Sequence, residues 1–585
     1  MAAKEPAPCA AGIQLPARPR LWIWPAVSCA IVLACILLSN PFNESGFCDD
    51  WSYGYVAMKL AATRHLQYSG WGNPMVLFQA LWALPWIRLF GFSFPVLAAS
   101  MVPIALAFVG MVYAVGREIG LRPSLAAFAA IAIGTCPLFT VLAGSFMTDA
   151  CGCFFAMLCI YTALRSVHAA QSASAVGWLW WLALAGVVGG SNRQIVWAAP
   201  LMLIPYLLWA RRRDSRFRIH AGAALAATIC AILAILHFFG QPFSPMLLSH
   251  GDLVWVLQHR WGRAVSLMAG FTLMSILLTV PVLCCFWSTV WRNPARSIFL
   301  LVLSVILTMA TTLVALPWPP YGNGFLTEVG PVVLGQDIIG KPPELSVWTR
   351  LALGVLVNFC VLAMLRALPD SRPAKMLRED RTLHVFAVFS AGYLALLMPG
   401  ALTGYTFDRY MLPCIALFML LALRRFAPGN RRIPVLAWLC CALFAAYGVA
   451  ATHDYFNALR ARTTAAHTLE QAGVPRNHIS AGFEYDAWTE VTGAGHVEVS
   501  RYQDQLVDNS ARGFWMEFWN HVPHSQPDFV ILHEQAGAPA GGGVFKVEFS
   551  AWLPPYRRSM VVWRRSQLTG IIRAVQTAPS VPNFF

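Results

Sequence analysis

The chain contains a succession of apolar runs of roughly 20 residues, each separated from the next by a polar segment. A run of this length is what an α-helix needs to cross the hydrocarbon core of a bilayer. Of the 585 residues, 58% are hydrophobic and 12% are charged. A soluble protein of this length cannot bury so much apolar surface. The runs therefore indicate an α-helical polytopic membrane protein.

About thirteen transmembrane helices are predicted, with ends placed to within about four residues. They lie near residues 21–39, 94–115, 124–143, 150–166, 176–191, 195–210, 220–239, 265–288, 297–316, 350–368, 382–399, 409–423 and 433–452. Together they predict a transmembrane domain over residues 21–452.

Lys and Arg collect in every second loop between the predicted spans. These loops carry about twice as many basic residues as the others, which is the distribution that the positive-inside rule describes. We therefore place the basic loops, and residues 1–20, in the cytoplasm, and interpret 21–39 as a retained span of an inner (plasma) membrane protein. The net charge of +15 follows from this topology, so nucleic acid is not an expected partner.

Residues 453–585 have a different pattern from the rest of the chain. An odd number of spans places this segment outside the cytoplasm. Its elements are a helical stretch at 457–473 and short strand-like pieces at 478–485, 527–534, 544–552 and 560–566. Pro and Gly turns separate these pieces. We predict a small extracytoplasmic α/β domain.

Two adjacent carboxylates, Asp49 and Asp50, follow the first span. They begin an external loop over residues 40–93, and the aromatic residues Trp51 and Tyr53 come directly after them. The rest of the loop has a short amphipathic segment and an apolar segment, which suits helices that lie along the membrane surface. A carboxylate beside another carboxylate has a raised pKa, so the pair suits general acid-base chemistry.

Three further polar clusters fall on the same predicted face of the membrane. They are Asp149, the triplet Asn192, Arg193 and Gln194, and the triplet Asp408, Arg409 and Tyr410. Each has a structural explanation by itself, because Asp149 can cap a helix and the arginines can extend to lipid headgroups. The shared face, with acids and isolated arginines together, favours a functional site.

The order of these motifs resembles that of the GT-C glycosyltransferases, and within them the protein O-mannosyltransferases and the lipid A aminoarabinose transferase. The resemblance rests on the acidic pair, on FMTDA at 146–150, on NRQ at 192–194 and on FDRYMLP at 407–413. It covers most of residues 20–450 and implies a GT-C fold. It also implies transfer of a sugar, with inversion, from an undecaprenyl- or dolichyl-phosphate carrier. The acceptor would be a glycan, lipid or protein at the outer membrane face.

The resemblance aligns Asp49 with the family's catalytic aspartate and Asp149 with the acidic residue of its second outer loop. An acceptor hydroxyl needs a general base, and we predict that Asp49 is this base. The predicted catalytic residues are Asp49, Asp50 and Asp149. The predicted substrate-binding residues are Trp51, Tyr53, Asn192, Arg193, Gln194, Asp408, Arg409 and Tyr410.

The departing phosphate needs positive charge, for which the residues offer two sources. Arg193 and Arg409 can supply it through charge-assisted hydrogen bonds. Alternatively, a divalent ion (Mg, Mn or Zn) held by Asp50 and Asp149 can act as a Lewis acid. The sequence leaves both possibilities open.

The sequence departs from the family pattern in the first external loop. The second acid of the pair is Asp50, where the family usually has Glu. The aminoarabinose-transferase-like members carry a Glu-Lys-Pro-Pro segment, where this chain reads WGNPMVLFQALW at 71–82. Gln79 is a weak substitute for that Glu, which argues against lipid A as the acceptor.

A secondary transporter or lipid flippase with outer-facing carboxylates is the alternative function. Transporters usually place ionisable residues near the bilayer midplane, on broken helices and in paired repeats. In this chain the acids fall at one rim of the predicted spans, and no internal repeat is evident. The pattern therefore favours the glycosyltransferase.

Overall fold

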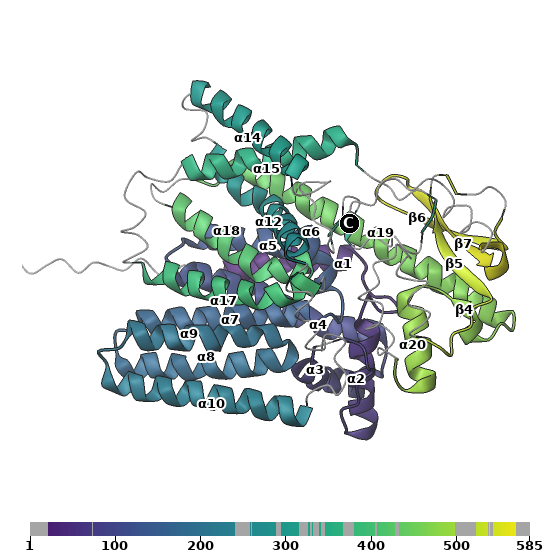
Figure 1. Ribbon diagram of the computed structural model, residues 1–585, viewed down its shortest axis with the longest axis horizontal. Helices are drawn as coiled ribbons and strands as arrows, with labels where there is room; N and C mark the ends of the chain where they lie inside the picture. The colour runs from purple at the N-terminus through teal and green to yellow at the C-terminus, as the bar shows by residue number, and fades with distance from the viewer. Residues whose placement is uncertain are drawn as a thin grey trace, which may run out of the picture.

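The computed structural model describes most of the chain. The described residues are 22–72, 74–239, 258, 260–287, 294–314, 326–327, 330–331, 338–340, 345–366, 380–403, 406–427, 432–497, 522–535, 537–538 and 542–568. They form a bundle of long helices with a small sheet domain beyond one end (Figure 1).

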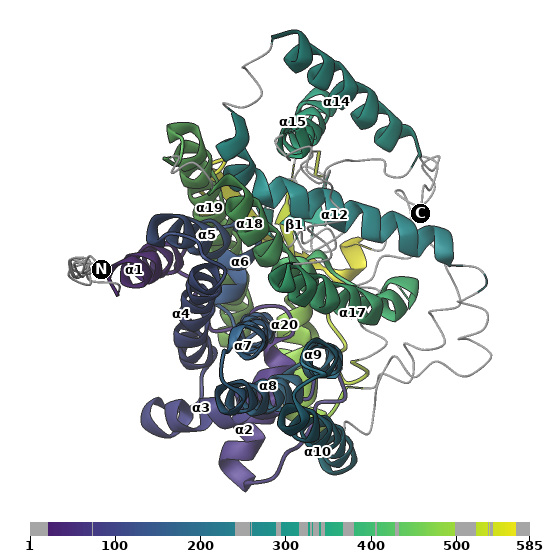
Figure 2. The ribbon, with the colours of Figure 1, turned by 90° about the vertical axis from the view of Figure 1, so that its left-hand side faces the viewer.

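The bundle confirms the predicted fold class. Its helices are α1 (Ile23–Leu38), α4 (Phe94–Glu118), α5 (Pro123–Gly134), α6 (Pro137–Ala143), α7 (Asp149–His168), α8 (Ser172–Asn192), α9 (Ala198–Ala210), α10 (Ser215–Phe239), α12 (Trp261–Leu283), α14 (Pro294–Val314), α15 (Val347–Arg366), α17 (Arg381–Thr403), α18 (Leu412–Phe426) and α19 (Val435–Gln471). Every predicted span overlaps one of these helices. Several of them are seen nearly end-on in Figure 2.

The number of helices that can cross a membrane depends on how the shorter ones are counted. Within the described residues, eight helices are long and apolar enough to do so by themselves. Helices α5 and α6 are bent by 73° relative to each other and are together long enough for one span. If they form one broken span, the number is nine. The other predicted spans fall on shorter helical stretches.

Proline explains the bend between α5 and α6. The residue before a proline is disfavoured in the helical conformation, and Cys136, which precedes Pro137, has an extended ψ of 144°. Pro137 then begins α6, where its missing N–H is harmless. The bend brings the end of α6 against the start of the loop over residues 40–93: a Cβ added to Gly144 would lie 2.5 Å from Pro41.

The loop over residues 40–93 contains two short helices, as predicted. These are α2 (Asp50–Thr63) and α3 (Leu77–Phe90). The first two turns of α2, residues 50–57, are buried. They lie at the same end of the bundle as the sheet domain (Figure 1).

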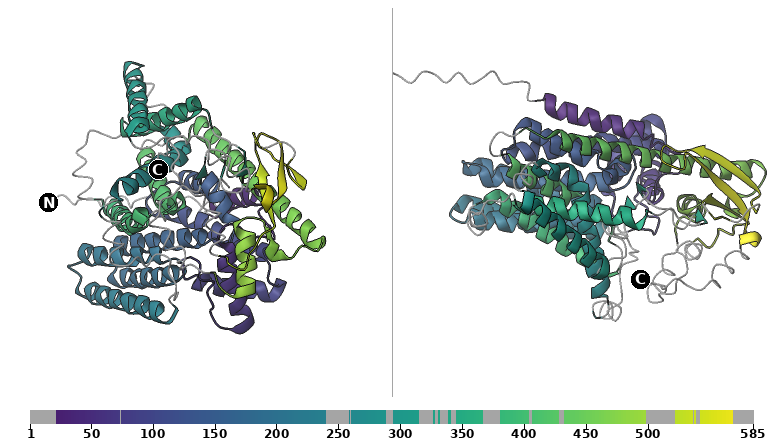
Figure 3. Two further views of the ribbon diagram at one scale, coloured as in Figure 1. Left: turned by 45° about the vertical axis from the view of Figure 1, so that its right-hand side comes forward. Right: turned by 90° about the horizontal axis from the view of Figure 1, so that it is seen from above.

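Helix α19 joins the bundle to the C-terminal domain without a break. Its 37 residues run through position 453, so the predicted domain boundary falls inside one continuous helix. The right-hand view in Figure 3 shows α19 extending from the bundle to the sheet. A rigid connection of this kind restricts the orientation of the domain.

The sheet is mixed and contains β3 (Ile338–Ile339), β4 (Ile479–Ser480), β5 (Phe529–Glu534), β6 (Phe545–Ser550) and β7 (Arg557–Arg564). Its order is β3-β5-β7-β6, and β4 also pairs with β5. The strands β3 and β4 are parallel to β5, whereas β7 is antiparallel to both β5 and β6. The predicted strands at 527–534, 544–552 and 560–566 are therefore confirmed.

The predicted strand at 478–485 is largely wrong. After the two residues of β4, Gly482 turns the chain at a φ of +85°, and helix α20 (Phe483–Ala494) begins. Glu484 and Asp486 lie in its first turn, where negative charge is favourable. The carboxylate of Asp486 also accepts from Ala481 N at 3.0 Å and so stabilises the turn.

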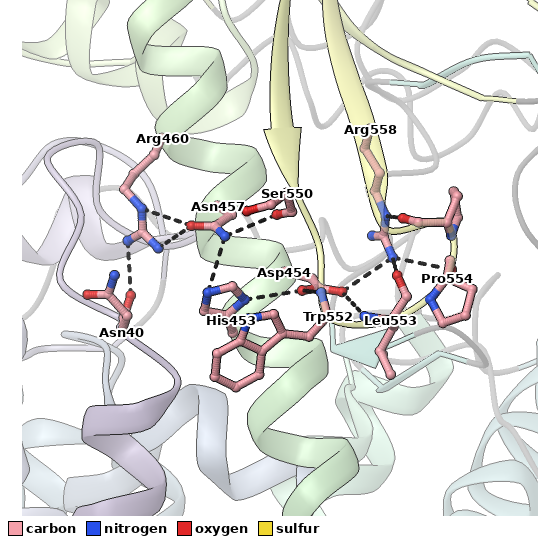
Figure 4. A network of polar contacts seen from close by, with 11 residues as sticks. Asn40, His453, Asp454, Asn457, Arg460, Ser550, Trp552, Leu553, Pro554 and Arg558 are labelled. Carbon is pink, nitrogen blue, oxygen red and sulfur yellow. Dashed lines mark hydrogen bonds and ion pairs between the residues drawn. The ribbon is translucent and has the colours of Figure 1, made fainter.

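A polar clasp fixes the β6–β7 turn to α19 (Figure 4). The carboxylate of Asp454 accepts from the backbone N–H of Trp552 at 2.6 Å, and the ring of His453 stacks on the Trp552 ring at 4.0 Å. Two turns along α19, Arg460 donates to the carbonyl of Asn40 at 2.9 Å, just beyond the end of α1. The clasp therefore holds the sheet domain beside the start of the loop over residues 40–93.

Candidate active site

The two adjacent acids have different surroundings. Asp50 is 3% exposed, and its Oδ2 accepts from the N–H groups of Phe47 at 3.1 Å and Phe146 at 3.0 Å. Burial raises the pKa of Asp50 well above its ordinary value. Asp50 therefore links the loop over residues 40–93 to the segment before α7.

Asp49 is the more accessible acid, with 22% of its side chain exposed. Its Oδ1 accepts from Trp71 Nε1 at 2.9 Å, and its Oδ2 lies 3.9 Å from Arg409 Nη2. Burial raises the pKa of Asp49, although Arg409 and the Trp71 hydrogen bond act in the opposite direction. A carboxylate with a raised pKa and partial access to solvent is suited to accept a proton.

Asp149 brings the two predicted arginines together. Its Oδ1 accepts a hydrogen bond from Arg193, and its Oδ2 lies 3.7 Å from Arg409 Nε. Arg409 therefore lies between Asp149 and Asp49, and its side chain is only 6% exposed. We call Asp49, Asp149, Arg193 and Arg409 the acid–arginine cluster. Its members come from four parts of the chain.

Aromatic rings cover the guanidinium groups of this cluster. The ring of Tyr410, in the 3₁₀ turn Asp408–Met411, lies 4.3 Å from the Arg193 guanidinium and 5.6 Å from that of Arg409. Phe407 lies 5.0 Å from the Arg409 guanidinium. Tyr53 is 3% exposed, and burial and the charge of Asp49 raise its pKa. Rings at these distances stabilise a cation and exclude water from it.

A glycine on α7 allows Arg193 to reach Asp149. Gly152 lies three residues after Asp149, and therefore on the same face of the helix. A Cβ added there would lie 3.0 Å from Cδ of Arg193. Any larger residue at 152 must displace the arginine side chain.

Asn192 and Asp408 support the cluster without being part of it. Asn192 is fully buried, and its Oδ1 accepts from Gln79 N at 3.0 Å, so it holds α3 against the end of α8. Asp408 accepts from Arg409 N and from Leu326 N, both at 2.7 Å. In both residues the side-chain oxygens accept hydrogen bonds from backbone N–H groups and so fix the local backbone.

The remaining predicted residues, Trp51 and Gln194, also lie nearby. Trp51 is fully buried and packs against Trp71 and Phe483, with ring centroids 6.1 Å and 5.7 Å away. Its ring therefore belongs to the packing beneath Asp49. Gln194 begins the 3₁₀ turn Gln194–Trp197, directly after Arg193.

Two residues at the site were not predicted from the sequence. Trp71, the partner of Asp49, lies in the Gly-rich turn of the loop over residues 40–93. Glu484, from α20 of the C-terminal domain, accepts from Cys48 N at 3.1 Å. The sequence feature that could have indicated Glu484 is Gly482 followed by two acids, Glu484 and Asp486, a pattern that is typical of a helix start.

The sequence left open a divalent ion held by Asp50 and Asp149, as an alternative to the two arginines. In the described part of the chain, no group of three His, Cys, Asp or Glu residues is placed to hold a metal ion. Asp50 accepts from two backbone N–H groups with its Oδ2, and Asp149 accepts from Arg193 with its Oδ1. The two arginines beside Asp149 already supply positive charge at this position.

No protein-family model matches the chain, and no curated protein sequence matches it. Several solved structures show similarity to it, among them the following three. ArnT from Cupriavidus metallidurans, bound to undecaprenyl phosphate, has 14% identity and a TM-score of 0.40, covering 93% of this chain and 98% of that chain. The protein O-mannosyltransferase Pmt1-Pmt2 complex of S. cerevisiae, bound to the sugar donor, has 15% identity and a TM-score of 0.32, covering 37% of this chain and 33% of that chain.

The Archaeoglobus fulgidus oligosaccharyltransferase has 12% identity and a TM-score of 0.26, covering 68% of this chain and 56% of that chain. All of these similar structures are GT-C glycosyltransferases. TM-scores of 0.40 or less do not determine the chemistry of this chain, which depends on the residues described above.

Proposed function

We propose that the chain is an integral-membrane glycosyltransferase that moves a sugar from a polyprenyl-phosphate donor to an acceptor hydroxyl. The observation that carries this proposal is the position of Arg409, between the partly exposed carboxylate of Asp49 and the buried pair of Asp149 and Arg193. A proton acceptor thus lies beside one cation, Arg409, and a second cation, Arg193, is paired with Asp149 behind it.

The proposed reaction is a single displacement at the anomeric carbon. The acceptor hydroxyl attacks this carbon while Asp49 takes its proton. The bond from the sugar to the phosphate oxygen breaks, and its electrons leave with the polyprenyl phosphate. Arg193 and Arg409 stabilise the developing negative charge. One displacement inverts the anomeric configuration.

The transporter alternative has less support from the geometry. Asp149 begins α7, Arg193 follows the last residue of α8, and Arg409 precedes α18. Charged groups at helix ends suit a surface reaction better than a path through the midplane.

Native mass spectrometry of the purified chain tests the proposal directly. We expect a co-purified polyprenyl-phosphate sugar, which a hydroxyl acceptor discharges to polyprenyl phosphate. A wild-type chain that neither binds nor discharges such donors, while it moves an ion or lipid across a vesicle membrane, would favour the alternative.

The proposed topology can be tested by labelling single cysteines in a background without the native ones. Ser566 and Ser215 are both exposed. Ser566 lies in the C-terminal domain, and Ser215 is the first residue of α10. An impermeant maleimide added from outside should label Ser566→Cys and not Ser215→Cys, because basic loops remain in the cytoplasm. The opposite pattern would place the acid–arginine cluster on the cytoplasmic side.

The pH profile of transfer should show the raised pKa of Asp49. A general base works only when it is deprotonated, so kcat/KM should fall as the pH decreases through that pKa. We expect this acidic limb above the ordinary aspartate value of about 3.9. The exposed variant Glu548→Gln should keep the wild-type limb, whereas a limb at or below 3.9 would contradict the assignment.

Gly152→Ala should slow transfer severalfold, up to about tenfold, because small displacements of a positioning group are costly. Its new methyl group would press on Arg193. Gly177→Ala on α8 is the matched control, since a Cβ there meets nothing within 4 Å. Equal transfer rates in the two variants would show that the close contact between residue 152 and the Arg193 side chain has no effect on the reaction.

A further inference from the structure

A second polar site lies at the opposite end of α7. It is a cavity of about 680 Å³ between the C-terminal ends of α7 and α9, the turn before α10, and the N-terminal end of α17. The 20 residues of α7 separate it from Asp149 by about 30 Å, at 1.5 Å per residue. The proposed transfer reaction does not use this cavity.

The cavity is strongly basic. Its lining contains four arginines, Arg211, Arg212, Arg213 and Arg381, and one acid, Asp214. With His384 neutral, the lining therefore carries a net charge of +3. This concentration of charge on one concave surface favours an anionic ligand.

Two of these arginines are held in place by the end of α7. Arg211 donates to the carbonyls of Ser166 and Ala169, both at 2.9 Å, and Arg381 donates to that of Val167 at 3.3 Å. A guanidinium has five N–H donors, so these bonds orient each group without using all of its donors. The positions of Arg211 and Arg381 therefore do not depend on a bound ligand.

The cavity opens beside an apolar surface. Trp209 is 57% exposed, and the Arg212 guanidinium lies 5.3 Å from its ring. Met202, two turns earlier on the same face of α9, is 40% exposed. Exposed tryptophan at a helix end is typical of the headgroup level of a membrane. An acyl chain can therefore follow α9 while a phosphate occupies the cavity.

We propose that this cavity binds an anionic phospholipid, with the phosphate held by its arginines and an acyl chain lying along Met202 and Trp209. Such basic pockets between membrane helices suit anionic headgroups. Zwitterionic lipids, whose headgroups carry no net charge, should bind less well.

Native mass spectrometry of the full chain from nanodiscs tests this proposal. Phosphatidylglycerol should be retained in preference to phosphatidylcholine. The double variant Arg212→Ala/Arg213→Ala should weaken this retention about tenfold or more, because it removes two charged donors. The matched control is Arg216→Ala/Arg218→Ala, which removes the same charge from exposed positions that do not line the cavity.

Two results would overturn the proposal. Equal losses in the two double variants would indicate a general basic surface. Thermal stabilisation of the wild-type chain in detergent by inorganic phosphate, equal to that by phosphatidylglycerol, would indicate a site for a free anion.

A different observation concerns the backbone immediately before Asp49. Cys48 has a φ of +46°, a conformation that non-glycine residues rarely adopt. Its N–H donates at 3.1 Å to Glu484, whose carboxylate also accepts from Tyr455 at 3.3 Å and lies 3.4 Å from Arg462. All three of these side chains are buried. The Glu484 carboxylate thus stabilises the unusual backbone conformation at Cys48, and its buried partners Tyr455 and Arg462 hold it in place.

We propose that Glu484 of the C-terminal domain is a positioning residue for Asp49, a role that depends on the proposed function. Helix α19 supplies Tyr455 and Arg462, and α20 supplies Glu484. The C-terminal domain thereby becomes part of the catalytic unit.

Three variants test this role. Glu484→Ala should lower kcat about tenfold or more, leave the KM for the donor within about twofold, and move the acidic limb of the pH profile. Glu484→Gln keeps an acceptor for the Cys48 N–H and should restore part of kcat. The exposed variant Glu548→Gln, with the same charge change, should match the wild type.

Hydrogen exchange separates this role from the reaction itself. In Glu484→Ala the Cys48 amide should exchange faster, whatever the chain catalyses, while peptides from α7 keep their protection. Unchanged exchange at Cys48, or an unchanged kcat and pH profile, would show that Glu484 does not position Asp49. An inactive wild type with faster exchange in the variant would contradict only the proposed function. Should Glu484→Ala not fold, Tyr455→Phe, which removes one bond to the carboxylate, should give smaller changes in the same direction.

Discussion

Asp49→Asn should abolish measurable transfer, with kcat lowered by about 10²–10⁴-fold, the range for loss of a general acid–base group. The amide has nearly the same shape, and its oxygen can still accept from Trp71 Nε1. Donor binding should therefore change little, because a base acts in the transition state more than in the ground state. Single-turnover rates and donor affinity, measured separately, check both parts of this expectation.

The neighbouring acid provides the control for this variant. Asp50 accepts from two backbone N–H groups, so Asp50→Asn should lower thermal stability more than Asp49→Asn does. Any folded fraction should retain more activity than Asp49→Asn. Wild-type turnover in Asp49→Asn would remove this residue from the chemistry, and the reverse order of activities would exchange the two roles.

Arg409→Ala should weaken donor binding by about 1.5–3 kcal/mol, the range for a hydrogen bond to a charged group, or roughly 10–150-fold. Arg193→Ala should have an effect of similar size. Replacing either arginine with Lys should preserve donor binding only in part, because Lys lacks the planar guanidinium that binds two phosphate oxygens. The measurement is a titration with polyprenyl-phosphate sugar in nanodiscs.

Removing either arginine also leaves Asp149 with one cation fewer, which can lower stability. Asp149→Asn combined with Arg409→Ala removes this unpaired charge, and donor binding should stay weak in the double variant. Arg165→Ala is the control for charge, since Arg165 pairs with Glu118 at the far end of α7. Unchanged donor affinity in both Arg193→Ala and Arg409→Ala would mean that the phosphate is held elsewhere.

Residues that are adjacent in sequence have different roles at this site. Asp49 and Asp50 form one motif, yet the start of α2 directs one carboxylate toward Arg409 and the other toward backbone N–H groups. The same holds for Asp408 and Arg409, of which only the second joins the acid–arginine cluster. Adjacent side chains of a turn or helix start point in different directions, so a motif alone does not assign their roles.

The sequence by itself determined the helical membrane fold and the four polar clusters, because apolar runs and basic loops act through local partitioning into the bilayer. Only the tertiary structure decided which members of these clusters meet. The contacts of Asp49 with Trp71, of Asp149 with Arg193, and of Cys48 with Glu484 join residues that are 22, 44 and 436 positions apart. Contacts over such separations depend on how helices pack and on where a glycine such as Gly152 leaves room, and no local pattern encodes either.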